Sequence, residues 1–187
     1  MTISIYAHKG GVGVTTVTAA LAIETAKTRF SGEWVTISAE LAECEDLCAV
    51  LGLGQPVTGP DGETAPIEML GIGIIIYPLA SSQTPPEPDF IVGYRGGENI
   101  TRYVVTRCCY VASRREAFTR KEWKPDGLIV IVEPGRALTP NDVSAAIGAP
   151  VVAEIPWDPT IARAIDAGML AGRVPASLAR PIHHLIP

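Results

Sequence analysis

A glycine-rich turn between an apolar segment and a helical one limits this chain to few architectures. Residues 2–7 (TISIYA) are apolar enough to form a buried strand. Residues 15–30 (TTVTAALAIETAKTRF) have apolar side chains at helical spacing, namely Val17, Ala20, Leu21 and Ala26. The turn KGGVGVTT (9–16) joins the two. A strand, a tight turn and a helix in this order are typical of α/β folds.

The rest of the chain alternates in the same way. Residues 55–71 are rich in turn residues and are expected to form a hairpin or a surface loop, and the tail 175–187 to include a short helix. The pattern predicts a single α/β domain over residues 1–187, a P-loop NTPase-like fold whose mostly parallel sheet has helices on both faces. Strands are expected at 33–38, 72–78, 89–94, 102–107, 127–134 and 149–156, and helices at 42–53, 110–120, 139–148 and 158–170.

Composition excludes several classes of protein. The net charge of −5 over 187 residues argues against a chain that binds nucleic acid over its whole surface. The longest apolar run, IGIIIY at 72–77, is far shorter than the roughly 20 residues that span a bilayer. The first residues lack a basic segment followed by a long apolar one. We therefore expect a cytoplasmic protein without a membrane partner.

Four cysteines allow two interpretations. Cys44 and Cys48 would share one helix face, and Cys108 and Cys109 are adjacent at the end of an expected strand. Their spacing does not match the paired C-x₂₋₄-C pattern of zinc sites. Buried core thiols are therefore the favoured interpretation, and a metal–thiolate protein is the alternative.

The glycine-rich turn has the chemistry of an anion site. Three glycines let successive backbone N–H groups point inward at a helix N-terminus, and this cradle needs no side-chain charge. Phosphate-binding loops follow G-x-x-x-x-G-K-[ST], with a lysine that meets the β- and γ-phosphates. Here Val14 stands at the lysine position, and Lys9 lies five residues earlier. The alternative is a tight strand-to-helix turn without a ligand.

KGGVGVTT resembles the deviant Walker A motif, K-G-G-x-G-K-[ST]-[ST], of the ParA/MinD family of dimeric P-loop ATPases, which position plasmids, chromosomes and division machinery. The resemblance implies ATP or ADP with Mg²⁺ as cofactors and Thr15 as the metal ligand. It implies that Lys9 is catalytic and reaches the partner's phosphates across a homodimer. A ParB-like or other protein partner and non-specific DNA are implied as further partners. The nucleotide contacts would come from Lys9, Gly10, Gly11, Val12, Gly13, Val14, Thr15 and Thr16.

Three later segments extend the resemblance. Residues 35–53 are similar to the segment in which the family has D-x-D, and those positions are Ser38 and Glu40 here. Glu40 is therefore the candidate for a retained catalytic carboxylate. Residues 89–97 resemble the Walker B strand, with Tyr94 at the Asp position. IPWDPTIARAIDAG (155–168) resembles the family's late I-P-x-D segment, which implies that Pro156 and Asp158 lie near adenine.

Three departures from the family pattern affect hydrolysis. Val14 lacks the ammonium group, Ser38 lacks a carboxylate, and Tyr94 is a neutral phenol where Mg²⁺ is normally supported. Losing one partner of a desolvated charge contact costs about 2–5 kcal/mol. We therefore expect a degenerate member, a dimeric nucleotide-binding switch with weak or absent hydrolysis. The alternative is a pseudo-ATPase scaffold that binds a protein partner or DNA whatever nucleotide is present.

Two further features lie outside the motifs. Residues 114–124 (RREAFTRKEWK) concentrate basic side chains and form either a DNA-phosphate patch or a solvated helix face, since Glu116 and Glu122 interrupt them. His8 flanks the glycine-rich turn and either touches a phosphate or only fits the turn. The candidate DNA residues are Arg114, Arg115, Arg120, Lys121 and Lys124.

Overall fold

An eight-stranded sheet forms the centre of the molecule, and every neighbouring strand pair except β3–β4 is parallel. The computed structural model describes residues 2–30, 33–54, 56, 67–69, 71–79, 87–93, 99–119 and 124–187. The strand order is β3-β4-β2-β5-β1-β6-β7-β8. The strands are β1 (Thr2–Tyr6), β2 (Val35–Ala39), β3 (Ile67–Met69), β4 (Ile74–Pro78), β5 (Phe90–Val92), β6 (Ile100–Arg107), β7 (Gly127–Val132) and β8 (Val151–Pro156).

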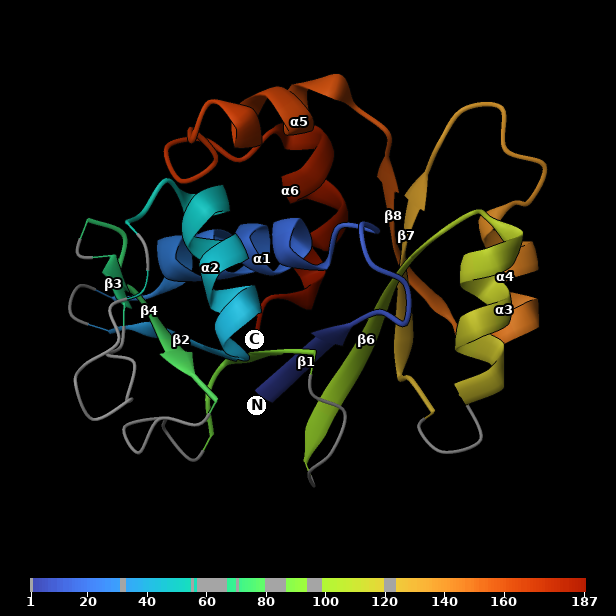
Figure 1. Ribbon diagram of the computed structural model, residues 1–187, viewed down its shortest axis with the longest axis horizontal. Coiled ribbons are helices and arrows are strands. Elements are labelled where there is room, and N and C mark those ends of the chain that lie inside the picture. The colour runs from blue at the N-terminus through green and yellow to red at the C-terminus, as the bar shows by residue number, and fades with distance from the viewer. Residues whose placement is uncertain are drawn as a thin grey trace.

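Helices cover both faces of this sheet. Figure 1 shows α1, α2, α5 and α6 on one side and α3 and α4 on the other. The segments β1–α1–β2, β6–α3–β7 and β7–α4–β8 are βαβ units, in which a helix connects two parallel strands of the sheet. The helices are α1 (Val14–Thr28), α2 (Leu41–Leu51), α3 (Tyr110–Thr119), α4 (Pro140–Ile147), α5 (Pro159–Asp166) and α6 (Ala176–Ile182), followed by the 3₁₀ turn η1 (His183–Leu185).

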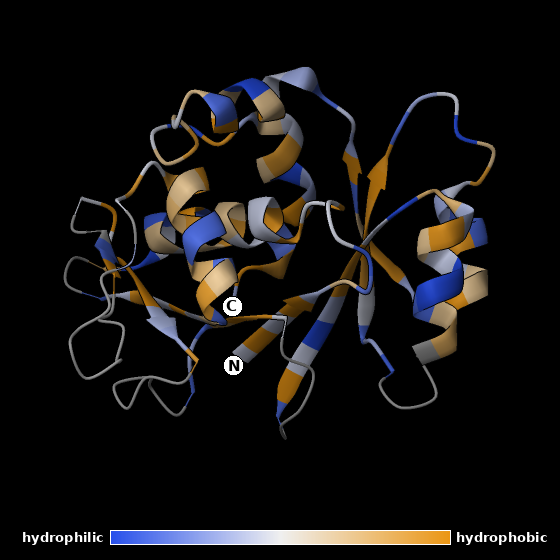
Figure 2. Cartoon of the chain, viewed as in Figure 1, coloured by the Kyte–Doolittle hydropathy of each residue, from blue (hydrophilic) through white to orange (hydrophobic). Residues whose placement is uncertain are grey.

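Two apolar clusters hold the layers together. Figure 2 shows hydrophobic residues along the strands and on the helices that cover them. The larger cluster joins one face of the sheet to α1, α2 and α6 and includes Ile3, Ile37 and Leu21. The smaller cluster joins the other face to α4 and includes Tyr6, Leu128 and Val143. Adjacent residues of a strand contribute to opposite clusters because strand side chains alternate between the two faces.

The predicted fold class is confirmed: the chain is a single α/β domain with helices on both faces of a mostly parallel sheet. Most of 55–71, expected to form a hairpin or a surface loop, lies outside the described residues; its described end contains β3, which pairs antiparallel with β4 beyond that stretch. The last long helix ends at Asp166 rather than at 170 because Gly168 adopts a left-handed φ of 62°. In the part of the chain that the structure describes, no helix is both long and apolar enough to cross a membrane.

Candidate phosphate-binding site

The glycine-rich turn connects the carboxyl end of β1 to the first residue of α1. Gly11 and Gly13 have φ values of 72° and 104°, a region that side-chain-bearing residues seldom adopt. A Cβ atom built on Gly10, Gly11 or Gly13 would meet no heavy atom within 4 Å. The turn therefore bends sharply and leaves open space directly above its backbone.

The N-terminus of α1 faces this space with its amides available. Gly13 is the N-cap residue, no side-chain hydrogen bond caps the helix among the described residues, and its first turn contains no acidic residue. The first N–H groups of any helix lack partners within the helix. Here they belong to Gly13, Val14, Thr15 and Thr16. Together with the helix dipole they make a site that attracts an anion.

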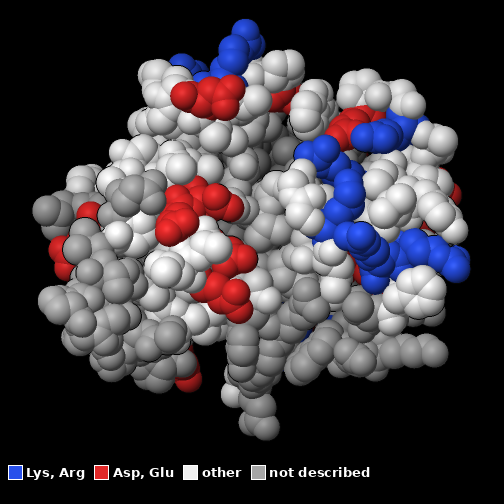
Figure 3. Space-filling view, in the orientation of Figure 1, with Lys and Arg blue, Asp and Glu red and all other residues white. Residues whose placement is uncertain are grey.

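A cavity of about 530 Å³ opens over the turn. This volume lies within the range of small-ligand pockets. Residues from the ends of several strands and from α1, α2, α5 and α6 complete its wall. In Figure 3 acidic side chains gather over α2, basic side chains gather over α3 and the adjoining loop, and the surface between them is hollowed. The lining includes all of residues 9–16, Glu43 and Asp46 of α2, Val92 and Gly93 at the end of β5, Arg107 of β6, and Pro156, Trp157 and Asp158 at the end of β8.

A cation bound beside the turn would find oxygen ligands there. Thr15 lines the cavity, as the resemblance implied for a metal ligand. Glu43 Oε2 is buried and has no hydrogen-bond partner among the described residues. Within the same limits no group of three or more His, Cys, Asp or Glu side chains could hold a metal ion alone. The pair of Thr15 and Glu43 suits Mg²⁺, which is usually bound through one or two protein groups together with substrate phosphates and water.

The predicted nucleotide contacts lie together, and the predicted catalytic pair does not. Lys9, Gly10, Gly11, Val12, Gly13, Val14, Thr15 and Thr16 all line the cavity, as do Pro156 and Asp158. Glu40 is exposed at the N-cap of α2 and is not among the lining residues. Ser38 is 1% exposed and its hydroxyl has no hydrogen-bond partner in the described structure. Tyr94 lies outside the described residues.

Asp158 also makes hydrogen bonds that stabilise the fold beside the cavity. Its carboxylate accepts hydrogen bonds from the Thr160 amide at 2.8 Å and from the Ser177 hydroxyl at 2.5 Å. These bonds, from Ser177 first and then Thr160, lower the pKa of Asp158. The residue thus caps α5 and ties it to the start of α6 beside the cavity.

His8 connects the turn to α3. The His8 amide donates to Glu116 Oε1 at 2.6 Å, and its ring Nδ1 lies 2.5 Å from Glu116 Oε2. Glu116 is only 4% exposed. The expectation that Glu116 interrupts the basic surface was therefore wrong, because its carboxylate is turned inward toward the turn. Arg114, Arg115 and Lys124 are exposed, and Arg120, Lys121 and Glu122 lie outside the described residues.

The cysteines contribute to packing. Cys44, Cys48 and Cys108 are buried free thiols, and Cys109 is partly exposed. Burial, the neighbouring Cys48 and two glutamates raise the pKa of Cys44 to about 12. The pKa values of Cys48 and Cys108 are also raised, and burial is the largest cause in both.

The cavity-wall residues that sequence reasoning missed include Glu43, Asp46, Arg107 and Trp157. Glu43 and Asp46 stand three apart in an expected helix, the spacing of one helix face. Arg107 is the last residue of an expected strand, at the edge where ligands bind. These signals are present in the sequence, but only the fold shows that the residues line the cavity over the glycine-rich turn.

Neither a protein-family model nor a curated protein sequence matches the chain. Solved structures do resemble it. The septum site-determining protein MinD of Pyrococcus horikoshii, complexed with Mg-ADP, superposes with a TM-score of 0.70 at 20% identity over 100% of this chain and 95% of that one. A chain of the MinC:MinD cell division protein complex of Aquifex aeolicus gives a TM-score of 0.68 at 17% identity over 98% of this chain and 96% of that one. The chain has the MinD/ParA fold. A ParA family ATPase from Chlorobium tepidum shares the fold more loosely, with a TM-score of 0.58 at 13% identity over 99% and 97% of the two chains.

Proposed function

We propose that the chain is a degenerate ParA/MinD-like protein that binds ATP or ADP with Mg²⁺ on residues 9–16. The observation that carries the proposal is the uncapped start of α1 facing an open glycine cradle inside a 530 Å³ cavity. Backbone amides at such a position bind phosphate without a neighbouring lysine. The MinD/ParA fold and the motif KGGVGVTT support the choice of a nucleotide over another anion.

Each group around the cavity has a role in this proposal. The amides of Gly13, Val14, Thr15 and Thr16 hold the phosphates. Thr15 and Glu43 hold Mg²⁺, which would neutralise phosphate charge when bound. The same ion offsets the repulsion between the phosphates and the carboxylates of Glu43 and Asp46, which share the cavity with them. Pro156 and Trp157 supply an apolar wall for the base.

Hydrolysis is weak or absent in this proposal. Phosphoryl transfer depends on positioned charge around the terminal phosphate. Val14 brings none, and it packs against the larger apolar cluster. Ser38 is buried and Glu40 stands outside the cavity wall, so neither contributes a carboxylate to it. The nucleotide then acts as a bound signal rather than as a rapidly consumed substrate.

The biological role that fits this chemistry is a cytoplasmic dimeric switch in plasmid or chromosome partition or in intracellular positioning. In that role Lys9 of each copy contacts the phosphates bound to the other copy, and assembly therefore depends on nucleotide. A ParB-like or other protein partner, and DNA at Arg114, Arg115 and Lys124, would respond to the assembled state. The support is the motif resemblance and the shared fold.

A second function, a nucleotide-independent scaffold for a protein partner or DNA, is favoured by one observation. Val14 stands at the position of the lysine that holds the terminal phosphates, and its partly buried side chain packs against the core. Steady ATP hydrolysis that disappears in Lys9→Ala would exclude this scaffold function.

The experiment that tests nucleotide binding compares two glycine variants. Gly11 and Gly135 have nearly equal left-handed φ values of 72° and 76°, and a Cβ at either meets nothing within 4 Å. Only Gly11 lines the cavity. Both alanine variants bear a similar backbone strain of about 1–2 kcal/mol. Fluorescently labelled ATP with Mg²⁺ is titrated into the wild type and each variant, and thermal unfolding checks their folding.

We expect the wild type and Gly135→Ala to bind ATP alike, and Gly11→Ala to bind at least tenfold more weakly because its methyl group occupies the cradle. Absence of wild-type binding at millimolar ATP overturns the proposal. Equal affinity of the two variants would show that the nucleotide binds elsewhere.

A further inference from the structure

Arg107 occupies the cavity wall beside the glycine-rich turn and is held from three sides. Its Nη2 donates to the Gly11 carbonyl at 2.6 Å, and its Nη1 donates to Glu133 Oε1 at 2.8 Å. Its Cζ lies 5.4 Å from the centre of the Trp157 ring, within the range of a cation–π contact. The guanidinium is therefore fixed before any ligand arrives, which reduces the entropy lost on binding.

The charge around Arg107 is not fully neutralised. Glu133 also pairs with Arg136, so two guanidinium groups share one carboxylate and the cluster keeps one positive charge. Arg136 is not among the residues that line the cavity, whereas Arg107 is. The positive charge that this cluster presents to the cavity therefore comes from Arg107.

Arg107 also has hydrogen-bond donors left for a ligand. A guanidinium carries five N–H groups in a planar fork that matches phosphate oxygens. The contacts to Gly11 and Glu133 use two of them. Its Nε is buried and has no hydrogen-bond partner among the described residues. A phosphate oxygen is an acceptor of the kind that these donors require.

The bond to Gly11 acts on the turn itself. The C=O and N–H of a trans peptide point in opposite directions, so holding the Gly11 carbonyl toward Arg107 turns the Val12 N–H away from it. One side chain thus fixes a peptide plane of the cradle and brings a cation to the same cavity. Apart from Lys9, it is the one basic residue of the described cavity wall.

We propose that Arg107 is the phosphate-binding cation of this site and takes the place of the lysine that position 14 lacks. The inference rests on the proposed nucleotide binding and adds to it the residue that balances the phosphate charge. A cation entering from the end of β6 replaces one from the start of α1, and the cradle of backbone amides is unchanged.

The test uses Arg107→Gln, with Arg136→Gln as its matched control, because both variants remove one arginine from the same carboxylate and only one alters the cavity. Affinities for ATP with Mg²⁺ and for inorganic triphosphate, which has no base, are measured by competition with labelled ATP. We expect Arg107→Gln to weaken both ligands by about 10- to 100-fold, the loss typical of a hydrogen bond to a charged group. Arg136→Gln should stay within about twofold of the wild type, as expected for an exposed ion pair.

Each other outcome overturns the assignment of Arg107. Unchanged affinity in Arg107→Gln excludes the contact, and a loss for ATP without a loss for triphosphate moves it to the nucleoside. An equal loss in Arg136→Gln shows that the effect passes through Glu133. Thermal unfolding without ligand checks the fold, and Arg107→Lys, which keeps the charge, serves if Arg107→Gln fails to fold. A wild type that binds no ATP overturns nucleotide binding itself and Arg107's role with it.

Discussion

Val14 is the residue at which this chain departs most clearly from a phosphate-binding loop. It is the first residue of α1, it lines the cavity, and it is only partly buried against the core. A lysine stem can lie along the same apolar surface while its ammonium group reaches the cavity. Val14→Lys should therefore tighten ATP binding by about tenfold or more, which titration calorimetry with Mg²⁺ and ATP measures.

Val14→Met separates the charge from the stem, because methionine adds a long flexible side chain without an ammonium group. We expect Val14→Met to bind ATP no better than the wild type. Equal gains in both variants would mean that the apolar stem acts alone and that the missing charge has no effect on affinity.

Buried thiols give the stability of the protein an alkaline dependence. The pKa of Cys44 is raised from 9.0 to about 12 in the fold. Between these values the unfolded chain loses a proton that the folded chain keeps, so the free energy of unfolding falls as pH rises. One thiol contributes a slope of up to about 1.4 kcal/mol per pH unit. Urea unfolding at intervals from pH 8 to pH 10.5 should show the decline.

Cys44→Ala is the control for this decline. It removes the titrating group and should make the slope shallower, although it lowers stability at every pH by leaving a small void. A slope identical to that of the wild type would assign the alkaline effect to other groups.

Single residues of the site were predictable only where local sequence defines them. The spacing of Gly10, Gly11 and Gly13 between a strand and a helix is a local pattern, and it placed the cradle. The contacts of Arg107 and Glu116 were not predictable, because their partners Gly11 and His8 lie 96 and 108 positions away. Such contacts are set by which strands become neighbours in the sheet.

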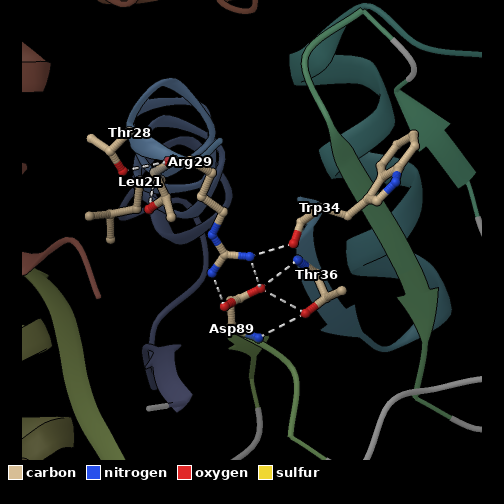
Figure 4. Close-up of polar contacts among 7 residues, drawn as sticks. Leu21, Thr28, Arg29, Trp34, Thr36 and Asp89 are labelled. Atoms are coloured by element: carbon tan, nitrogen blue, oxygen red, sulfur yellow. Dashed lines mark hydrogen bonds and ion pairs between the residues drawn. The ribbon is translucent and has the colours of Figure 1, made fainter. Parts of the chain in front are cut away.

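At the scale of elements, one carboxylate joins three of them at the amino-terminal edge of the sheet, opposite the cavity. Figure 4 shows Asp89, just before β5, accepting hydrogen bonds from the Arg29 guanidinium and from Thr36. Thr36 on β2 donates through its amide at 2.8 Å and its hydroxyl at 2.9 Å. Arg29 directly follows α1 and also donates to the Trp34 carbonyl.

Asp89→Ala should lower the free energy of unfolding by about 2–3 kcal/mol, because it strips partners from a partly buried guanidinium and a backbone amide at once. Urea unfolding measures the change. Glu24→Ala is the control, since it breaks only the exposed i,i+3 pair with Lys27 and should cost under about 1 kcal/mol. Equal losses would remove the special role of Asp89. ATP affinity should hardly change in either variant.

Elements were predictable where period and end signals agreed. The apolar residues of β1 and of α1 have the spacing of a strand and of a helix, and the turn between these elements is rich in glycine. The end of α5 was misjudged, because the apolar spacing of Ile161, Ile165 and Met169 continues past it. Gly168 with its left-handed φ ends that helix, and Met169 is 64% exposed. The left-handed glycine therefore decides where α5 ends, although the spacing of apolar residues continues beyond it.

At the scale of the whole molecule, opposite charges flank the cavity. Glu43 and Asp46 lie on the α2 side, and basic side chains gather over α3 on the same face (Figure 3). A two-fold axis through the centre of this face would place the acidic side of one copy over the basic side of the other. Self-complementarity of this kind is what a symmetric dimer requires. The same two-fold axis would place the phosphate sites of the two copies opposite each other.

We therefore expect a monomer without nucleotide and a dimer with Mg²⁺ and ATP, measured by light scattering after gel filtration at two salt concentrations. High salt should weaken the dimer, because the paired surfaces are charged. Lys9→Ala should raise the dimer dissociation constant by about 30-fold or more if Lys9 crosses to the other copy's phosphates. Lys27→Ala, which removes an exposed lysine that pairs within α1, is the matched control and should leave assembly unchanged. A dimer that forms equally well in Lys9→Ala would show that the copies meet elsewhere, and the phosphates would then have no part in joining them.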